Sequence, residues 1–352
     1  MYLALALATA LLQTPAPAAT PTPAQLEEQD TCLTCHADAS LAVDLPSGER
    51  RSLHVDLDKF KASVHGRKLT CVDCHAEMKE IPHPERSFKS ARDFTVAYYE
   101  QCKRCHFSEY TKTLDSVHYA ALARGDRTAP LCVDCHGSHE IVDPTTSRTA
   151  IVEICGKCHA GVSAAYRKSV HGQQLGGPNE RDVPVCNDCH RTHDVAGPRE
   201  ADWRLKTPEL CASCHGNEAL MKKYGLSTAV ITTYVSDFHG KTVSLRSSER
   251  GQGGDAPFTA LCTDCHGVHD IMKADAPNSA VIQANLQKTC QRCHPGASTN
   301  FSSAWLSHYE PSLKKAPAVY AVKMFYMVFI PFIIGGLALQ VLLHLWRVVV
   351  NR

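Results

Sequence analysis

Paired cysteines followed by a histidine are the residues of this chain whose spacing indicates chemistry. Residues 132–140 read CVDCHGSHE, and close copies occur at 186–194 and 262–270. Each copy has two thiols three positions apart, an imidazole directly after the second thiol, and another imidazole three residues later. Thiols and imidazoles are the side chains that bind soft metals or a metal-bearing cofactor. The pattern therefore predicts repeated binding of a metal or a metal-bearing group.

The chain has 18 cysteines, and every one lies in a C-x-x-C-H motif. The cysteine pairs are Cys32/Cys35, Cys71/Cys74, Cys102/Cys105, Cys132/Cys135, Cys155/Cys158, Cys186/Cys189, Cys211/Cys214, Cys262/Cys265 and Cys290/Cys293. The histidines that follow them are His36, His75, His106, His136, His159, His190, His215, His266 and His294. This spacing is typical of covalent haem attachment, because two thiols on one helical turn can form thioethers with the porphyrin vinyl groups. The adjacent imidazole then lies under the iron as its proximal ligand.

Other uses of cysteine explain the pattern less well. Zinc sites combine two C-x-x-C pairs and do not require a histidine after every second cysteine. Redox dithiols do not occur nine times in one chain, and a disulfide framework would not keep uniform spacing. The sequence therefore predicts nine covalently attached haem c groups.

The nine motifs make the chain resemble the multihaem c-type cytochromes, and the resemblance covers residues 32–308. It implies closely stacked haems with two histidine ligands each, and it implies electron transfer. The motifs by themselves predict only attachment and one axial ligand.

Second ligands can come from the other histidines, because the chain has 20 in all. A recurring V-H-G element and its variants supply five candidates: His65, His118, His171, His239 and His308. Three candidates follow their own motif in the pattern C-H-x-x-H, and these are His139, His193 and His269. His83 takes the corresponding place after the second motif. A trailing histidine shares a helical face with its own proximal histidine. We therefore expect it to reach the iron of a neighbouring haem. His54 is left over, and His344 lies in an apolar stretch.

These elements recur in the same order along the chain. The repeat predicts dihaem modules that begin near residues 32, 102, 155 and 211, and a half module that begins at 290. Together they would form a haem domain of residues 31–310. We expect a mostly α-helical fold with extensive loops and little strand. With so many haems per residue, the haems themselves would form most of the core.

Both chain ends carry apolar segments. Residues 1–18 have the pattern of a signal peptide, and a Pro-rich stretch over 19–30 predicts an extended linker. Residues 324–343 are uncharged and long enough to cross a bilayer, which predicts a transmembrane helix over 318–347 and a cytoplasmic tail over 348–352. The haem domain would then face the periplasm, tethered by one C-terminal helix.

The leading functional hypothesis is an electron conduit between the membrane quinone pool, or a membrane partner, and periplasmic or outer acceptors. A quinone-oxidising subunit or a cytochrome b-type protein, periplasmic redox proteins and the lipid bilayer are the expected partners. Basic and acidic residues balance at 37 and 36, so no charge excess indicates nucleic acid. The alternative is an enzyme, similar to the octahaem cytochromes that convert tetrathionate, nitrite or hydroxylamine, in which one haem iron stays open to a nitrogen or sulfur oxyanion. The histidine count leaves no obvious vacancy for such a site.

Overall fold

The structure is a computed structural model that describes residues 21–78, 80–84, 86–143, 147–198, 201–248, 259–303, 308, 310–314 and 316–351. The signal peptide that the sequence predicts over 1–18 lies outside the described residues. The chain divides into two compact units, one of residues 1–160 and 185–196 and the other of residues 161–184 and 197–352. Each unit is described separately below.

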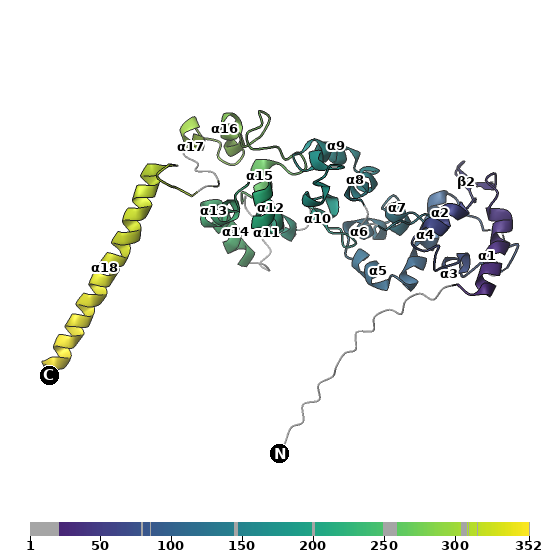
Figure 1. Cartoon of the computed structure of the whole chain (residues 1–352), viewed down its shortest axis with the longest axis horizontal. Coiled ribbons are helices and arrows are strands. Elements are labelled where there is room, and N and C mark those ends of the chain that lie inside the picture. The colour runs from purple at the N-terminus through teal and green to yellow at the C-terminus, as the bar shows by residue number, and fades with distance from the viewer. Residues whose placement is uncertain are drawn as a thin grey trace, which may run out of the picture. The chain divides into compact units, whose positions relative to one another are not determined.

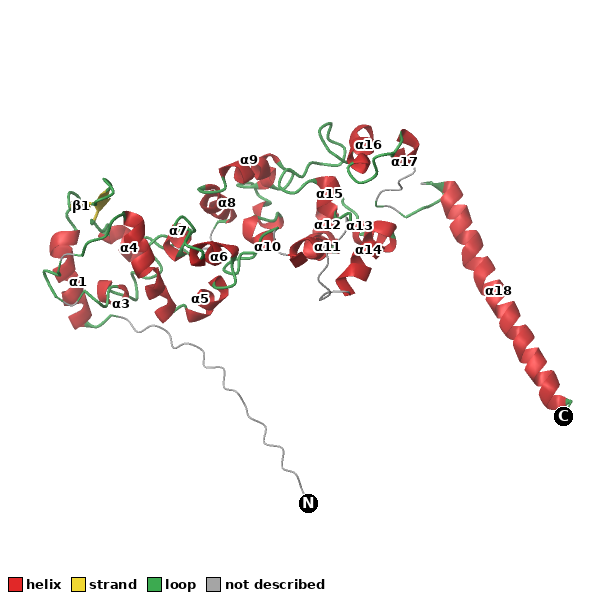
Figure 2. Cartoon of the chain, turned by 180° about the vertical axis from the view of Figure 1, so that it is seen from behind, coloured by secondary structure: helices red, strands yellow, loops and turns green. Residues whose placement is uncertain are grey.

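The first unit consists of short helices joined by loops, with one two-stranded hairpin (Figures 1 and 2). In this hairpin, Ala42 pairs with Ser52 and Asp44 with Arg50 in antiparallel register. Its elements are α1 (Pro23–His36), β1 (Ala42–Asp44), β2 (Arg50–Ser52), α2 (Leu57–Ala62), α3 (Cys71–Cys74), α4 (Ala91–Tyr98), the 3-10 helix η1 (Tyr99–Arg104), α5 (Phe107–Thr113), α6 (Val117–Ala123), α7 (Cys132–His136), α8 (Arg148–Gly156) and α10 (Cys186–His190).

The second unit is helical throughout its described elements, and it ends in one continuous helix of 34 residues (Figure 1). Its elements are α9 (Ala160–Lys168, whose first residue falls in the other unit), η2 (Gly172–Gln174), η3 (Glu180–Asp182), α11 (Ala201–His215), α12 (Glu218–Lys223), α13 (Ala229–Ser236), α14 (Phe238–Ser248), α15 (Cys262–His266), α16 (Gln283–Gln291), α17 (Thr299–Ser303) and α18 (Pro317–Val350). The prediction of a mostly helical chain with extensive loops is confirmed for the described residues.

Two kinds of C-x-x-C-H motif can be told apart by the helix that carries them. We call the motifs beginning at residues 32, 102, 155, 211 and 290 the A motifs, and those beginning at 71, 132, 186 and 262 the B motifs. Each B motif forms a helix of four or five residues that begins at its first cysteine. Such a short helix is unstable alone, so its backbone donors need partners.

An aspartate at the third position of each B motif supplies one such partner. Its carboxylate accepts the backbone N–H of the residue before the motif, at 2.7 Å for Thr70, Leu131 and Val185 and 2.8 Å for Leu261. A carboxylate near a helix N-terminus also interacts favourably with the helix dipole. The C-x-D-C-H sequence therefore specifies its own helix start.

Buried apolar side chains are few for a chain of this length. Among the described residues they are Ala129, Leu131, Val152, Val183, Val185, Ala196, Met221, Tyr234, Val243, Leu261 and Ala297. Three of them directly precede a B motif. Burial of apolar surface is the main favourable term in folding. The few buried side chains therefore fit the expectation that the haems supply most of the apolar core.

Three differences from the sequence predictions concern boundaries. The predicted linker over 19–30 is wrong from Pro23 onward, where α1 begins, because Thr22 and Gln25 form a capping box and proline is favourable at the first helical position. The apolar helix α18 runs to Val350, so most of the predicted tail over 348–352 is helical. The predicted single domain over 31–310 divides between two compact units.

Candidate haem-attachment sites

Each C-x-x-C-H motif brings its thiols and its imidazole together within one short turn of chain. In the motifs beginning at residues 71, 102, 155 and 290, the backbone N–H of the histidine donates to the backbone carbonyl of the first cysteine at 2.9 Å. The first cysteine is half-buried in all nine motifs. Two sulfurs on one turn are what a double thioether to one porphyrin requires.

The second cysteine is the more open of the two in six of the nine motifs. It is exposed at Cys35, Cys74, Cys105, Cys135, Cys158 and Cys293, and half-buried at Cys189, Cys214 and Cys265. The protein's own residues therefore do not enclose the second sulfur of any motif, although the sequence assigns a thioether bond to each. An open sulfur is accessible to a porphyrin edge, and attachment through all nine second cysteines stays a prediction.

The motif histidines face other histidines in pairs. The pairs that the structure describes are His36–His83, His65–His106, His75–His139, His118–His159, His136–His193, His171–His215, His239–His294 and His266–His308. Their ring centres are 5.9 to 6.5 Å apart. An imidazole nitrogen binds a metal at about 2 Å and lies about 1 Å from its ring centre, so two imidazoles on opposite sides of one metal ion have ring centres about 6 Å apart. The spacing fits two axial ligands of one iron.

The two kinds of motif receive their opposing histidine from different places. The A motifs beginning at 102, 155, 211 and 290 face a V-H-G histidine that precedes them, as His106 faces His65. Three B motif histidines, His75, His136 and His266, face a histidine that comes later, as His75 faces His139. His190 and His269 lie in different units, so their role as ligands stays a prediction. His54 lies beside Asp38 and is in none of the imidazole pairs described.

Partial burial favours the neutral form of five of these imidazoles. Desolvation lowers the pKa of His171 to about 4 and is also the first cause of a lowered pKa at His75, His136, His139 and His266. An imidazole must be neutral to offer a lone pair to a metal. The lowered pKa of these five histidines therefore favours metal ligation.

A serine or aspartate two positions before the histidine forms a hydrogen bond that stabilises the turn of the V-H-G element. The side-chain oxygen of Ser63, Ser169 or Asp237 accepts the N–H of the glycine after the histidine, at 3.0, 3.1 and 2.9 Å. Ser63 and Ser169 are buried. We did not single out this capping residue from sequence, although S-V-H is visible as a recurring triplet and serine is a preferred N-cap.

The glycine of this element permits close backbone approach. A Cβ atom on Gly172 would lie 2.0 Å from the carbonyl oxygen of Tyr166, and one on Gly240 would lie 2.1 Å from that of Tyr234. Both contacts are with backbone, which cannot rotate away as a side chain can. The small residue therefore sets how near the histidine-bearing turn comes to the preceding helix.

A backbone hydrogen bond joins three of the V-H elements to a trailing histidine segment. The N–H of Val64 donates to the carbonyl of Ile141 at 2.9 Å, Val117 donates to Val195 at 2.9 Å, and Val170 donates to Ile271 at 2.8 Å. The acceptor lies two residues after the trailing histidine in each case. This recurring joint ties successive repeats together, and short-range sequence patterns give no sign of it.

The first cysteines of an A motif and the following B motif are in contact. Within the first unit, sulfur–sulfur hydrogen bonds join Cys32 to Cys71, Cys102 to Cys132 and Cys155 to Cys186. Within the second unit, the same contact joins Cys211 to Cys262. The two attachment points of one module therefore adjoin.

The second cysteine of a B motif lies near the A motif that follows it. Cys74 is within electrostatic range of Cys102 and Cys105, Cys135 of Cys155 and Cys158, and Cys265 of Cys290 and Cys293. Attachment points thus adjoin in sequence order inside each unit, both within a module and from one module to the next.

Not every second cysteine has a described neighbour of this kind. Cys35 belongs to the first motif, so no B motif precedes it. Cys214 is within 3.8 Å of the Ser213 hydroxyl, which donates to its sulfur. Cys189 lies in the first unit, whereas the A motif that follows it lies in the second. The attachment role of these three sulfurs depends on the motif pattern alone.

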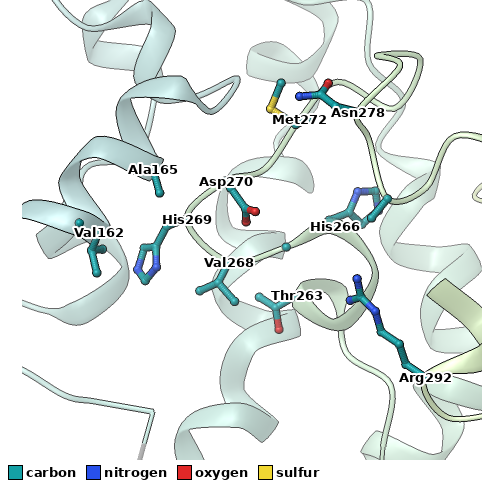
Figure 3. Close-up of a pocket in the computed structure, with 13 residues that line it drawn as sticks. Val162, Ala165, Thr263, His266, Val268, His269, Asp270, Met272, Asn278 and Arg292 are labelled. Carbon is teal, nitrogen blue, oxygen red and sulfur yellow. The ribbon is translucent and has the colours of Figure 1, made fainter. Parts of the chain in front are cut away.

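One cavity beside the fourth B motif has the size of a cofactor site. It measures about 480 Å³ and is lined by residues of α9 and α15, of the loop after α15, and by Arg292 at the end of α16 (Figure 3). His266 and Arg292 border one part of it, and His269, Val162 and Ala165 border another (Figure 3). Ligand cavities of about 300 to 1,000 Å³ are typical of cofactor sites. The mixture of imidazole, guanidinium and apolar side chains suits a porphyrin with propionates.

Comparison with known proteins agrees with this chemistry. A family model described as cytochrome c3 matches residues 126–216. The chain is 25% identical over 294 residues to the multiheme cytochrome MtrA of Shewanella baltica, an alignment that covers 72% of this chain and 80% of that protein.

A second likeness is to the high-molecular-weight cytochrome c of Nitratidesulfovibrio vulgaris, at 22% identity over 186 residues. It covers 51% of this chain and 30% of that longer protein. No solved structure matches the chain. The motifs, the paired imidazoles and these likenesses agree, and all three make the chain similar to the multihaem c-type cytochromes.

Proposed function

We propose that the chain is a membrane-tethered electron conduit with nine covalently attached haem c groups, each held between two histidines. The observation that carries the proposal is the set of imidazole pairs with ring centres 5.9 to 6.5 Å apart. When bound, each haem supplies an iron that takes up and releases one electron.

The residues of the chain hold and insulate that iron. In each motif the two cysteine sulfurs would hold the porphyrin edge, and the adjacent histidine would bind the iron. The opposing histidine would be the second iron ligand and would keep substrates from the metal. Imidazole on both sides favours a low reduction potential compared with methionine ligation, because it is the better electron donor.

Attachment points that adjoin in sequence order support a linear path through each unit. The Cys102 and Cys132 sulfurs are in contact, and Cys135 lies near Cys155 and Cys158. An electron would therefore move from one motif to the next along the chain rather than converge on one centre. A path of this kind favours conduction over catalysis at a single open haem.

The apolar helix α18 supports attachment to a membrane. It has 34 residues, its most apolar 18-residue stretch has a mean hydropathy of 2.2, and its apolar side chains are largely exposed. A helix of about 20 residues already spans the hydrocarbon core. Electrons from a quinol-oxidising subunit or a cytochrome b-type partner would enter near His294 and His308 and leave toward periplasmic or outer acceptors.

The test is the mass and the electron paramagnetic resonance spectrum of the purified, fully oxidised protein. We expect a mass increase equal to nine haems and low-spin iron throughout. A high-spin signal near one-ninth of the iron would contradict the conduit and favour an oxyanion-converting enzyme. A mass increase equal to fewer than nine haems would contradict the proposed haem number.

A further inference from the structure

Three B motifs share an ion pair that the attachment chemistry does not require. Arg92 contacts Asp134 at 2.7 Å, Arg148 contacts Asp188, and Arg204 contacts Asp264 at 2.9 Å. In each pair the aspartate is the third residue of a B motif, and the arginine lies 7 or 10 residues before the first cysteine of the preceding A motif. We call each of these pairs an Arg–Asp clasp.

The clasp acts on the carboxylate that starts the B motif helix. The Oδ2 atom that accepts the arginine also accepts the N–H of Leu131, Val185 or Leu261. All three of these residues are buried. The carboxylate is therefore held from both sides, by the first turn of its own helix and by the segment that leads into the other motif.

Each clasp is the second of two contacts between the same pair of motifs. The first is the sulfur contact, for example between Cys155 and Cys186. Arg148 and Cys155 both lie in α8, seven residues apart, so the two contacts are about 10 Å apart along the helix axis. One contact would leave the B helix free to pivot, whereas two contacts fix its orientation.

The first module lacks this arrangement. Asp73 caps its helix in the same way, at 2.7 Å from the N–H of Thr70. The sequence of α1, which carries the preceding A motif, contains no arginine. Arg104 of the following A motif donates to the backbone carbonyl of Asp73 at 2.8 Å, a contact that Arg292 also makes with Asp264, at 3.3 Å. The cap therefore occurs without the clasp, so the two serve separable roles.

We propose that the Arg–Asp clasp is a positioning device that fixes the separation of the two haem attachment sites within a module, and with it the rate of electron passage between them. The proposal rests on the proposed function above. A surface ion pair by itself contributes little to stability, so its repetition at one structural position requires a purpose other than stability. Electron tunnelling falls steeply with separation, which makes orientation the property that such a clasp can control.

The test uses the full holoprotein with Arg148→Gln, which keeps the Asp188 cap and removes the clasp. Lys223→Gln is the matched control, because Lys223 forms a partly exposed ion pair with Asp182 and neither residue belongs to a C-x-x-C-H motif. The measurements are the haem content by mass, the magnetic interaction between neighbouring irons, and the rate at which electrons cross the protein after rapid mixing with a reductant.

We expect Arg148→Gln to keep every haem, to change the magnetic interaction, and to slow electron passage severalfold, with Lys223→Gln unchanged and Arg148→Lys partly restored. An Arg148→Gln protein with unchanged interaction and rate would overturn the proposal. Arg204→Gln gives the same readouts should Arg148→Gln fail to fold. A low haem number or high-spin iron in the unsubstituted protein would instead count against the proposed function, so the two failures are distinguishable.

Discussion

The A and B motifs are supported by the fold in two structurally different ways. The A motifs that begin at Cys32, Cys155 and Cys211 lie at the end of helices of 9 to 15 residues, and those helices position the cysteines. The B motifs begin helices of four or five residues whose start depends on one aspartate. The opposing histidines differ too, since most A motifs face a histidine from earlier in the chain and B motifs face one from later.

The comparison teaches that a uniform covalent motif need not have uniform support. The helix that precedes an A motif positions its cysteines. A B motif depends instead on the aspartate that caps its own helix and on residues far away in the sequence. Substitutions at matched positions can separate these two forms of support.

The largest effect is expected from the opposing histidine of a B motif. His139→Ala removes the imidazole that faces His75, so one haem should change from low-spin to high-spin while the haem number stays the same. The measurement is the high-spin fraction of the oxidised protein. His54→Ala is the control and should leave the spectrum unchanged; a high-spin signal in the control alone would contradict the pairing.

A strong effect on stability is expected at the turn that holds the histidine opposite an A motif. Gly172→Ala would bring a Cβ atom to 2.0 Å from the Tyr166 carbonyl oxygen, which should lower the free energy of unfolding by about 3 kcal/mol. Gly161→Ala in the adjoining helix meets no atom within 4 Å and should raise that free energy by about 0.5 kcal/mol. Denaturant unfolding of both variants checks the contrast, and equal effects would refute it.

A moderate effect is expected at the cap that distinguishes the B motifs. Asp264→Ala removes the acceptor of the Leu261 N–H and should cost about 1 kcal/mol of unfolding free energy. Ser213→Ala, at the same position of the preceding A motif, should change it by less than about 0.5 kcal/mol because that helix is already formed upstream. Thermal unfolding midpoints test this pair; a larger loss at Ser213 would reverse the assignment of the cap.

The smallest effect is expected at the residue after a B motif. Gly137, Arg191 and Gly267 all have positive φ there, at 76°, 66° and 84°. Arginine is strained in this conformation by about 1 kcal/mol. Arg191→Gly should therefore raise the free energy of unfolding. The gain is reduced slightly because the substitution also removes the exposed Arg191–Asp194 ion pair. A higher midpoint of thermal unfolding is the expected result, and a lower one would show that the arginine side chain contributes more than its backbone strain costs.

Much of the site could be predicted from sequence because its chemistry is local. The cysteines and proximal histidines are fixed by a five-residue pattern, and the V-H-G and C-H-x-x-H patterns identified the imidazoles that the structure places opposite them, such as His118 and His193. The helical character of the chain and the length of α18 also follow from local patterns.

Long-range relations could not be predicted in this way. Which motif each imidazole faces depends on contacts between repeats, such as the bond from Val64 to Ile141, and no periodicity encodes that choice. The Arg–Asp clasps join residues 40 or more positions apart, as Arg148 and Asp188 are. The helix start at Pro23 was missed because the proline-rich composition was weighted above the capping box that follows Thr22.

The direction from which each opposing histidine comes has a consequence for biogenesis. His65, His118 and His171 precede the motifs they face, so in the exported protein that we propose they would already have crossed the membrane when those motifs emerge. Maturation could then finish at these A sites during export. The B motif histidine His266 faces a later residue, His308, which lies nine residues before α18 begins. That last B site would therefore be completed only when the proposed membrane helix is delivered.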